Sequence, residues 1–204
     1  MADATVKVRR TQVERRAHTR AALIEAAVAC VNIVGPASVS TAQIAATAGV
    51  TRGAVQHHFG SAQELYLAVV NHAWEEIAAV YRTAPGLDVS LDRRITGWGT
   101  TMVQAYTHPA ALAGYEILVH YRGNAGFMAE HTPMALAAEQ RLDELWVAAF
   151  TDTGLSRAEL VGIRHTARTF MLGAVARRLM IPETDADLRR ELTDLLRAFL
   201  PARQ

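Results

Sequence analysis

The sequence has a single cysteine, Cys30, and no long hydrophobic run. One cysteine excludes an internal disulfide, which fits a reducing compartment. No apolar stretch approaches the roughly 20 residues that a membrane-spanning helix needs. The charged N-terminus also lacks the apolar segment of a secretion signal. The sequence therefore predicts a soluble, cytoplasmic protein that does not associate with membranes.

Motifs for catalysis are missing as well. The sequence has no glycine-rich phosphate loop, no serine nucleophile elbow, no metal-binding His/Glu helix and no Cys/His pair in a supporting context. Glu116 and His120 are four residues apart, a spacing that suits a metal or an acid/base pair. His108, His131 and His165 offer no spacing that would complete a metal site. We therefore expect no enzymatic activity, no cofactor and no bound metal.

Charge is unevenly distributed along the chain, although the formal net charge is only +1. Residues 1–60 contain seven Lys and Arg against three Asp and Glu, a net of +4, so residues 61–204 carry a net charge of −3. A basic end favours a polyanionic partner, because each phosphate neutralised by Lys or Arg releases condensed counterions. A merely solvated basic tail has the same pattern, so charge alone does not decide between the two.

No segment has the alternating β-branched pattern of a strand, whereas helix-forming residues dominate throughout. Glycine and proline divide the chain into nine predicted helices, three short ones followed by six that are mostly longer. Several starts show a capping box, in which a Ser or Thr oxygen accepts the N3 amide and a Glu or Gln at N3 bonds back. The breaks are Gly35-Pro36, Gly49, Gly60, Pro85-Gly86, Pro109, Gly123 to Gly126, Pro133, Gly154 and Pro182, and the boxes are Thr11/Glu14, Ser40/Gln43, Ser61/Glu64 and Ser156/Glu159.

The first predicted helix carries one apolar stripe, which needs a partner to bury it. Leu23, Ala27, Val31 and Val34 recur at helical spacing and form this stripe. A short helix from about Thr41 to Ala48 provides the partner. Its inward positions are Ile44, Ala45 and Ala48.

A tight turn joins this short helix to the next one. Gly49 occupies the position at which a left-handed residue ends a helix. Thr51 is expected to cap a helix over residues 52–59, whose Val55 and Phe59 face inward. Two short helices joined by a glycine turn are typical of the helix-turn-helix, whose second helix lies in a DNA major groove. A three-helix unit that merely packs is the alternative.

The stretch from Val39 to Leu65, VSTAQIAATAGVTRGAVQHHFGSAQEL, strongly resembles the TetR family of regulators. The resemblance covers about 50 residues, Ala22 through Val69, whereas the rest of the chain agrees only in helix number, length and break positions. It implies an all-α fold, with a three-helix DNA-binding head over residues 1–60. It also implies a six-helix ligand-binding and dimerisation bundle over residues 61–204, and a homodimer that binds a palindromic operator.

Carried over position by position, the resemblance assigns roles in DNA binding. Arg52 is the main candidate for reading a guanine, since its guanidinium can donate to both O6 and N7 and so discriminate by roughly 1–3 kcal/mol. The implied base contacts come from Arg52, Gly53, Ala54, His57 and Ala42, and the implied phosphate contacts from Ser40, Thr41, Gln56 and His58.

Two positions depart from the family pattern. Gln56 stands where a phosphate-binding Tyr is usual, and Ala62 where a Lys is common, and both changes weaken anchoring to the DNA backbone. We hypothesise that arginines before and within the first helix compensate by reaching phosphates or the minor groove. These are Arg9, Arg10, Arg15 and Arg16.

The helix predicted over residues 61–82 has apolar side chains on more than one face, so it can pack against both domains. One face carries Leu65, Val69, Ala73 and Ile77, and other faces carry Leu67, Val70 and Trp74. The resemblance implies that this helix links the DNA head to the ligand-binding body. Its movement would then change the separation of the two recognition helices.

Large side chains with polar tips occur between residues 98 and 171, as suits a mostly apolar pocket with a few orienting contacts. The resemblance implies such a pocket for a small, largely apolar effector, while core packing is the alternative for each residue. The candidates are Trp98, Met102, Tyr106, Tyr115, Glu116, His120, Tyr121, Phe127, Trp146 and Phe170.

The last two predicted helices, over about residues 156–180 and 183–200, are amphipathic and suggest self-association. The resemblance implies that they pair with their symmetry mates as a four-helix bundle. The candidate contacts are Leu160, Ile163, Ala167, Gly173, Leu188, Leu192, Leu195 and Phe199.

These features together favour a ligand-responsive transcriptional regulator, a repressor that its effector releases from DNA. The alternative is a ligand-independent regulator or activator whose C-terminal domain only dimerises or docks a protein. Small hydrophobic molecules that raise the melting temperature and release DNA would distinguish the two.

Overall fold

A computed structural model describes residues 11–178, 180–181 and 184–200, and these residues form helices without any strand. The all-α fold predicted from the sequence is confirmed, and so is the number of helices within the described residues. Arg9 and Arg10 lie outside them. The helices are α1 (Gln12–Val34), α2 (Thr41–Thr47), α3 (Gly53–Phe59), α4 (Ala62–Tyr81), α5 (Leu91–Thr107), α6 (Pro109–Tyr121), α7 (Ala125–Ala149), the 3₁₀ turn η1 (Thr151–Thr153), α8 (Arg157–Arg177) and α9 (Asp185–Phe199).

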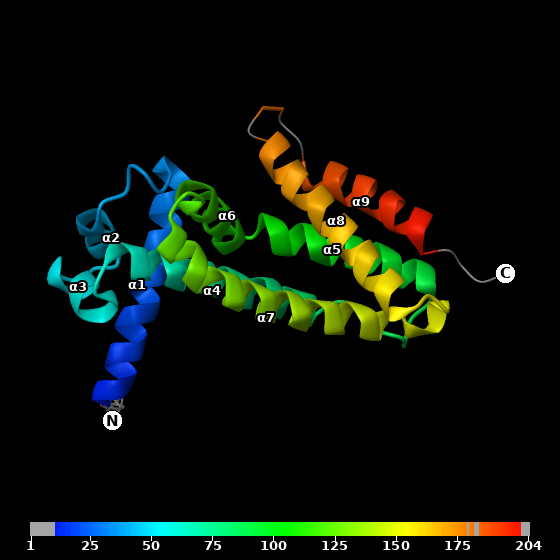
Figure 1. Cartoon of the computed structure of the whole chain (residues 1–204), viewed down its shortest axis with the longest axis horizontal. Coiled ribbons are helices and arrows are strands. Elements are labelled where there is room, and N and C mark those ends of the chain that lie inside the picture. The colour runs from blue at the N-terminus through cyan, green and yellow to red at the C-terminus, as the bar shows by residue number, and fades with distance from the viewer. Residues whose placement is uncertain (1–10, 179, 182–183, 201–204) are drawn as a thin grey trace, which may run out of the picture.

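The three N-terminal helices form a small head at one end of the molecule, and α5, α8 and α9 lie toward the other end (Figure 1). α4 and α7 run between the two ends (Figure 1). α4 packs against α1 and α3 of the head and also against α5, α6 and α7. One helix is therefore shared by the head and the larger bundle.

The head core follows the apolar pattern of α1. Leu23, Ala27 and Val31 are fully buried, as the stripe predicts. Val34 is the exception, with 47% of its surface exposed, because α1 ends at this residue, beyond the part that the other head helices cover. Ile44 and Ala45 of α2 are buried, as expected.

The turn after α2 has the geometry that Gly49 predicts. Gly49 has φ 67°, and its amide donates to the Ala46 carbonyl at 3.1 Å. The Val50 amide donates to the Ala45 carbonyl at 2.9 Å, which completes a Schellman motif. The prediction for Thr51 was wrong. α3 begins at Gly53 without a side-chain cap, because Arg52 already has helical dihedral angles and the Ala54 amide bonds the Thr51 carbonyl at 2.9 Å.

Side-chain caps fix most of the predicted helix starts. At Ser61 the hydroxyl accepts the Glu64 amide, but Glu64 bonds back to the hydroxyl rather than to the amide. A further box at Thr184 was missed because its N3 residue is Asp187, outside the Glu/Gln pattern. Complete boxes form as predicted at Thr11/Glu14, Ser40/Gln43 and Ser156/Glu159.

Pro133 does not separate two helices, contrary to the sequence prediction, but lies inside α7. Proline removes one backbone hydrogen bond, leaving the carbonyl of Ala129 without its usual donor. Both residues are exposed, so water can satisfy that carbonyl. α7 begins instead after Gly123, where the Asn124 side chain accepts the Phe127 amide at 2.9 Å.

By length and mean hydropathy alone, α1 qualifies as a candidate membrane span, the one such helix in the described part of the chain. This modifies the expectation that no segment approaches that length. Arg20 and Glu25 interrupt the apolar residues of α1, and its buried face belongs to the head core. Core helices of water-soluble proteins pass the same test, so the finding is weak support for a membrane span.

Candidate nucleic-acid interface and ligand cavity

α3 has one buried face and one exposed face. Val55 and Phe59 are 3% and 4% exposed and hold the helix against the head core. Arg52, Gly53, Gln56 and His57 are exposed, and Ala54 and Ala42 are half-buried. The fold therefore brings the predicted base-contacting residues of α3 to one accessible face.

A groove beside α3 is lined with basic residues of α1. Arg15 and Arg16 from α1 lie in it together with His57 and His58 from α3. The Arg20 guanidinium lies 4.8 Å above the Phe59 ring, which joins α1 to the end of α3. The positive charge on this side of the head thus comes from both α1 and α3. The sequence alone does not predict that these two sets of basic residues lie side by side.

His58 lies within this positive field. Partial burial lowers its pKa, and the neighbouring His57, Arg16 and Arg20 lower it further. Its ring meets the His57 ring edge-on at 5.1 Å, and its Nδ1 atom is buried without a hydrogen bond. A nearby anion would favour the protonated form, so this position suits contact with phosphate.

Of the other predicted phosphate contacts, Gln56 lies exposed on α3, and two lie around the N-terminus of α2. Ser40 is the N-cap of α2, and its hydroxyl donates to the Gln43 side chain at 2.9 Å. Thr41, the first residue of α2, is half-buried. Ala62, where a Lys is common, is exposed at the start of α4.

Comparison with known proteins identifies this head. A family model described as bacterial regulatory proteins of the tetR family matches residues 23–69. The HTH-type transcriptional regulator CymR of Pseudomonas putida is 42% identical over 69 residues, which is 34% of each chain. The N-terminal head, over residues 23–69, is that of the TetR family.

Solved structures extend the similarity in fold to nearly the whole chain. A TetR-family regulator from Mesorhizobium loti is 17% identical, with a TM-score of 0.70, and the match covers 91% of this chain and 96% of the other. LfrR from Mycobacterium smegmatis, solved in complex with proflavine, is 16% identical, with a TM-score of 0.64 and coverage of 92% and 99%. At these identities the structures show a shared fold.

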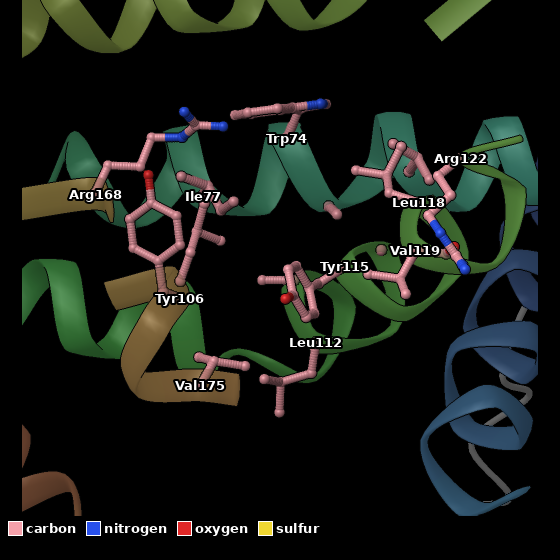
Figure 2. Close-up of a pocket in the computed structure, with 15 residues that line it drawn as sticks. Trp74, Ile77, Tyr106, Leu112, Tyr115, Leu118, Val119, Arg122, Arg168 and Val175 are labelled. Atoms are coloured by element: carbon pink, nitrogen blue, oxygen red, sulfur yellow. The ribbon is translucent and has the colours of Figure 1, made fainter. Parts of the chain in front are cut away.

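The larger bundle contains a cavity of about 310 Å³ among α4, α5, α6 and α8. Trp74 and Ile77 contribute from α4, and Leu112 and Tyr115 from α6 (Figure 2). Of the predicted pocket residues, Tyr106 and Tyr115 line it. Arg168 also lines it, and the remaining lining residues, which the sequence analysis did not select, are Val70, Ala73, Ala111, Gly114, Leu118, Val119, Arg122, Leu172 and Val175.

Polar groups in the cavity wall are few. Arg168 and Tyr106 lie at one end of the cavity and Arg122 at the other (Figure 2). Tyr106 is buried, and its hydroxyl has no hydrogen-bond partner. Burial raises the pKa of Tyr106, with Glu139 adding to the shift, so the hydroxyl keeps its proton. The Tyr81 hydroxyl is close enough to affect this pKa but does not form a hydrogen bond of good geometry.

A buried ionic cluster lies behind Arg168. Arg164 is fully buried and pairs with Glu139 and with Asp143, its Nε atom lying 2.5 Å from an Asp143 oxygen. Arg168 Nε lies 2.9 Å from the second oxygen of Glu139. His165 lies 3.4 Å from Asp143 on the exposed side. The two carboxylates are therefore occupied by α8 side chains and take no part in the cavity wall.

Two predicted pocket residues, Trp98 and Trp146, fill the core instead. Their rings meet edge-on at 5.1 Å, and both are about 1% exposed or less. Each indole N–H donates to a backbone carbonyl, at 3.1 Å to Pro85 and at 2.8 Å to Leu160. Their polar tips are thus already satisfied within the protein.

The other pocket candidates also lie outside the cavity wall. Tyr121 stacks on buried Phe127 at 4.3 Å, and exposed His120 meets the Tyr121 ring edge-on. Met102 is fully buried, while Glu116 and Phe170 are half-buried. Within the described residues, no three His, Cys, Asp or Glu side chains are arranged to hold a metal ion.

The structure narrows the predicted dimer surface. Five candidates are buried within the protomer, so a partner subunit cannot contact them without repacking; they are Leu160, Ile163, Ala167, Leu188 and Leu192. Gly173 and Phe199 are exposed, and Leu195 is half-buried. Gly162 is exposed on the same helix as Gly173, and neither glycine has another part of the chain near the position of a Cβ atom.

Proposed function

We propose that this chain is a TetR-family, ligand-responsive transcriptional regulator that binds duplex DNA through α3. The division of α3 into an apolar buried face and an exposed face with Arg52 and His57 carries this proposal. An arginine exposed at the start of a short, well-packed helix suits bidentate contact with guanine in a major groove.

In this proposal residues 1–60 form the DNA-binding domain, and residues 61–204 form the effector-binding and dimerisation domain. The groove between α1 and α3 contacts phosphates through Arg15 and Arg16, which supports the predicted compensation for Gln56 and Ala62. The protein acts in the cytoplasm and is not an enzyme.

The DNA-binding part can be tested with the duplex found by footprinting the DNA that flanks the encoding gene. Arg52→Ala and His57→Ala should each weaken selective binding, Arg52→Ala by roughly 1–3 kcal/mol relative to a scrambled duplex. Arg93→Ala, at an exposed position on α5, is the matched control and should bind like the parent. If both substitutions in α3 leave the selectivity unchanged, α3 is not the reading helix.

A homodimer through α8 and α9 would present two heads to a palindromic site. The exposed glycines of α8 allow close approach of a second helix, and Phe199 of α9 is 49% exposed. Gly173→Arg and Phe199→Glu should shift the protein to a monomer in analytical ultracentrifugation and abolish operator binding. Leu136→Glu, at a 61% exposed apolar position on α7, is the control and should remain dimeric.

Effector binding in the cavity would act through α4, which lines the cavity and packs on the head. A ligand that binds the two packings of α4 unequally would shift the separation of the heads. Release of labelled operator by a cavity ligand tests this step. If saturating ligand leaves the operator bound, the alternative of a ligand-independent regulator is favoured.

A further inference from the structure

The charged side chains in the cavity wall are all of one sign. Among the described lining residues, Arg122 and Arg168 are the charged ones, and no carboxylate is present. Glu139 and Asp143 lie behind the wall, where both pair with Arg164 and Glu139 also pairs with Arg168 Nε. The rest of the lining is apolar or aromatic. A cationic ligand would therefore meet no opposite charge in the cavity wall, whereas an anionic ligand could pair with either of the two arginines.

The two arginines are not equivalent. Arg122 is exposed and already donates to the Val119 carbonyl at 2.6 Å. Arg168 is only partly exposed, and none of the described hydrogen bonds involves its guanidinium, although Nε faces Glu139 as an ion pair. A guanidinium has five N–H donors, so Arg168 retains donors for a ligand. The anion is thus expected at the Arg168 end of the cavity.

Tyr106 provides a second donor at that end. Its hydroxyl is buried and has no hydrogen-bond partner. A buried donor without an acceptor lowers the stability of the protein, so a ligand that accepts this hydrogen bond is favoured. Tyr106 and Arg168 line the same end of the cavity (Figure 2). A carboxylate has two acceptor oxygens and can accept from both at once.

We propose that the effector is a compact apolar molecule with one carboxylate, held by Arg168 and Tyr106, with its apolar body against Trp74, Ile77 and Leu112. This rests on the proposed function, of which it names the ligand class. The cavity volume of about 310 Å³ lies at the lower end of the range for ligand pockets, which favours a small molecule. Aromatic lining residues favour a ring in the apolar body.

The test compares probes that differ only in the head group. 4-Phenylbutanoate, 4-phenylbutanol and 4-phenylbutylamine are titrated into the full chain by calorimetry without DNA, and an octanoate, octanol and octylamine set repeats the comparison. The carboxylates should bind roughly 10- to 100-fold more tightly than the alcohols, the range for hydrogen bonds to charged groups. The amines should bind most weakly. If an alcohol or amine binds as tightly as its carboxylate, or if none of the six binds at millimolar concentration, the proposal is wrong.

Substitutions locate the carboxylate. Arg168→Gln should remove most of the preference for carboxylate over alcohol, and Tyr106→Phe should reduce it by about 10-fold while keeping the ring. Tyr81→Phe, beside Tyr106 but outside the wall, and Arg122→Gln should keep the preference. Circular dichroism confirms that each variant is folded, and Tyr106→Phe keeps the test valid if Arg168→Gln unfolds. A preference that survives Tyr106→Phe but not Arg122→Gln would overturn the placement.

Operator binding is measured separately, so the two proposals can fail separately. If carboxylates bind but the operator is retained, the ligand class stands and ligand-induced release fails. If only uncharged or cationic molecules release the operator, the regulator stands and the carboxylate proposal fails.

Discussion

The hydroxyl of Tyr66 on α4 donates a hydrogen bond to the backbone carbonyl of Pro36, at 3.1 Å, in the connection between α1 and α2. Tyr66 is 4% exposed and Pro36 is half-buried, so the bond is partly shielded from water. The bond ties the shared helix directly to the head. Tyr66→Phe removes it without changing the ring.

We expect Tyr66→Phe to lower the free energy of unfolding by about 1 kcal/mol, because the Pro36 carbonyl loses its donor. Urea denaturation followed by circular dichroism measures the change. Tyr121→Phe is the control, since none of the described hydrogen bonds involves the Tyr121 hydroxyl, and it should have a smaller effect. Equal losses in the two variants would mean that the bond to Pro36 contributes nothing.

Stability should also fall in alkaline solution. Burial raises the pKa of Tyr66 to about 12, from 10.0 in an exposed tyrosine, with Tyr121 and Cys30 adding to the shift. Between these pH values the folded state holds a proton that the unfolded state has lost, so stability decreases as pH rises from about 10 to about 12. Tyr66→Phe should flatten this decrease only in part, because Tyr81 and Tyr106 also have raised pKa values. Thermal melts at intervals over this range test the slope.

Operator affinity should rise as pH falls from 7.5 to 5.5. The pKa of His58 is lowered in the free protein by burial and by its positive neighbours. A phosphate nearby would raise it, so DNA binding takes up a proton and is favoured by acid. Anisotropy titrations at constant ionic strength measure the trend. His58→Gln should weaken this dependence of operator affinity on pH. His120→Gln, at an exposed position outside the head, should leave the dependence as in the parent.

Two glycines in the head should respond oppositely to substitution by alanine. Gly49→Ala places a side chain at φ 67° and should destabilise the protein by roughly 1 kcal/mol. Gly53→Ala lies in α3 with open space around the new methyl, and should keep or raise stability while weakening operator binding. Measuring the melting temperature and the operator affinity of both variants separates effects on stability from effects on DNA recognition. Weakened DNA binding by Gly49→Ala alone would contradict the assigned roles.

The ionic cluster at Arg164 should be far more sensitive than surface pairs. Arg164→Met leaves Glu139 and Asp143 without their buried partner, which should cost about 3–5 kcal/mol. Arg157 on the same helix pairs with Glu144 at 2.7 Å, but both side chains are more than half exposed. Arg157→Met should therefore cause no measurable loss. Denaturation of the two variants under identical conditions makes the comparison.

The head could be predicted from the sequence because short-range signals determine it. Gly49, the inward pair Val55 and Phe59, and the Ser40 box act over a few residues, so their spacing alone gives the geometry. The absence of a cap at Thr51 depends on the backbone angles of Arg52, which spacing does not reveal.

The cavity could not be predicted residue by residue. Trp74 and Trp98 are both apolar aromatics on amphipathic helices, yet one lines the cavity and the other fills the core. The difference arises from how α4, α6 and α8 pack, which depends on contacts between distant parts of the chain. The same reason explains why Leu160 and Leu188 face their own protomer.

α4 supplies four residues of the cavity wall, Val70, Ala73, Trp74 and Ile77, and the same helix packs on α1 and α3. A substitution that reshapes the wall for a new molecule therefore also alters the packing of α4 against α1 and α3. Ligand specificity and affinity for DNA are therefore expected to change together over evolution. Substitutions at these four positions should be accompanied by second substitutions in α1 or α3.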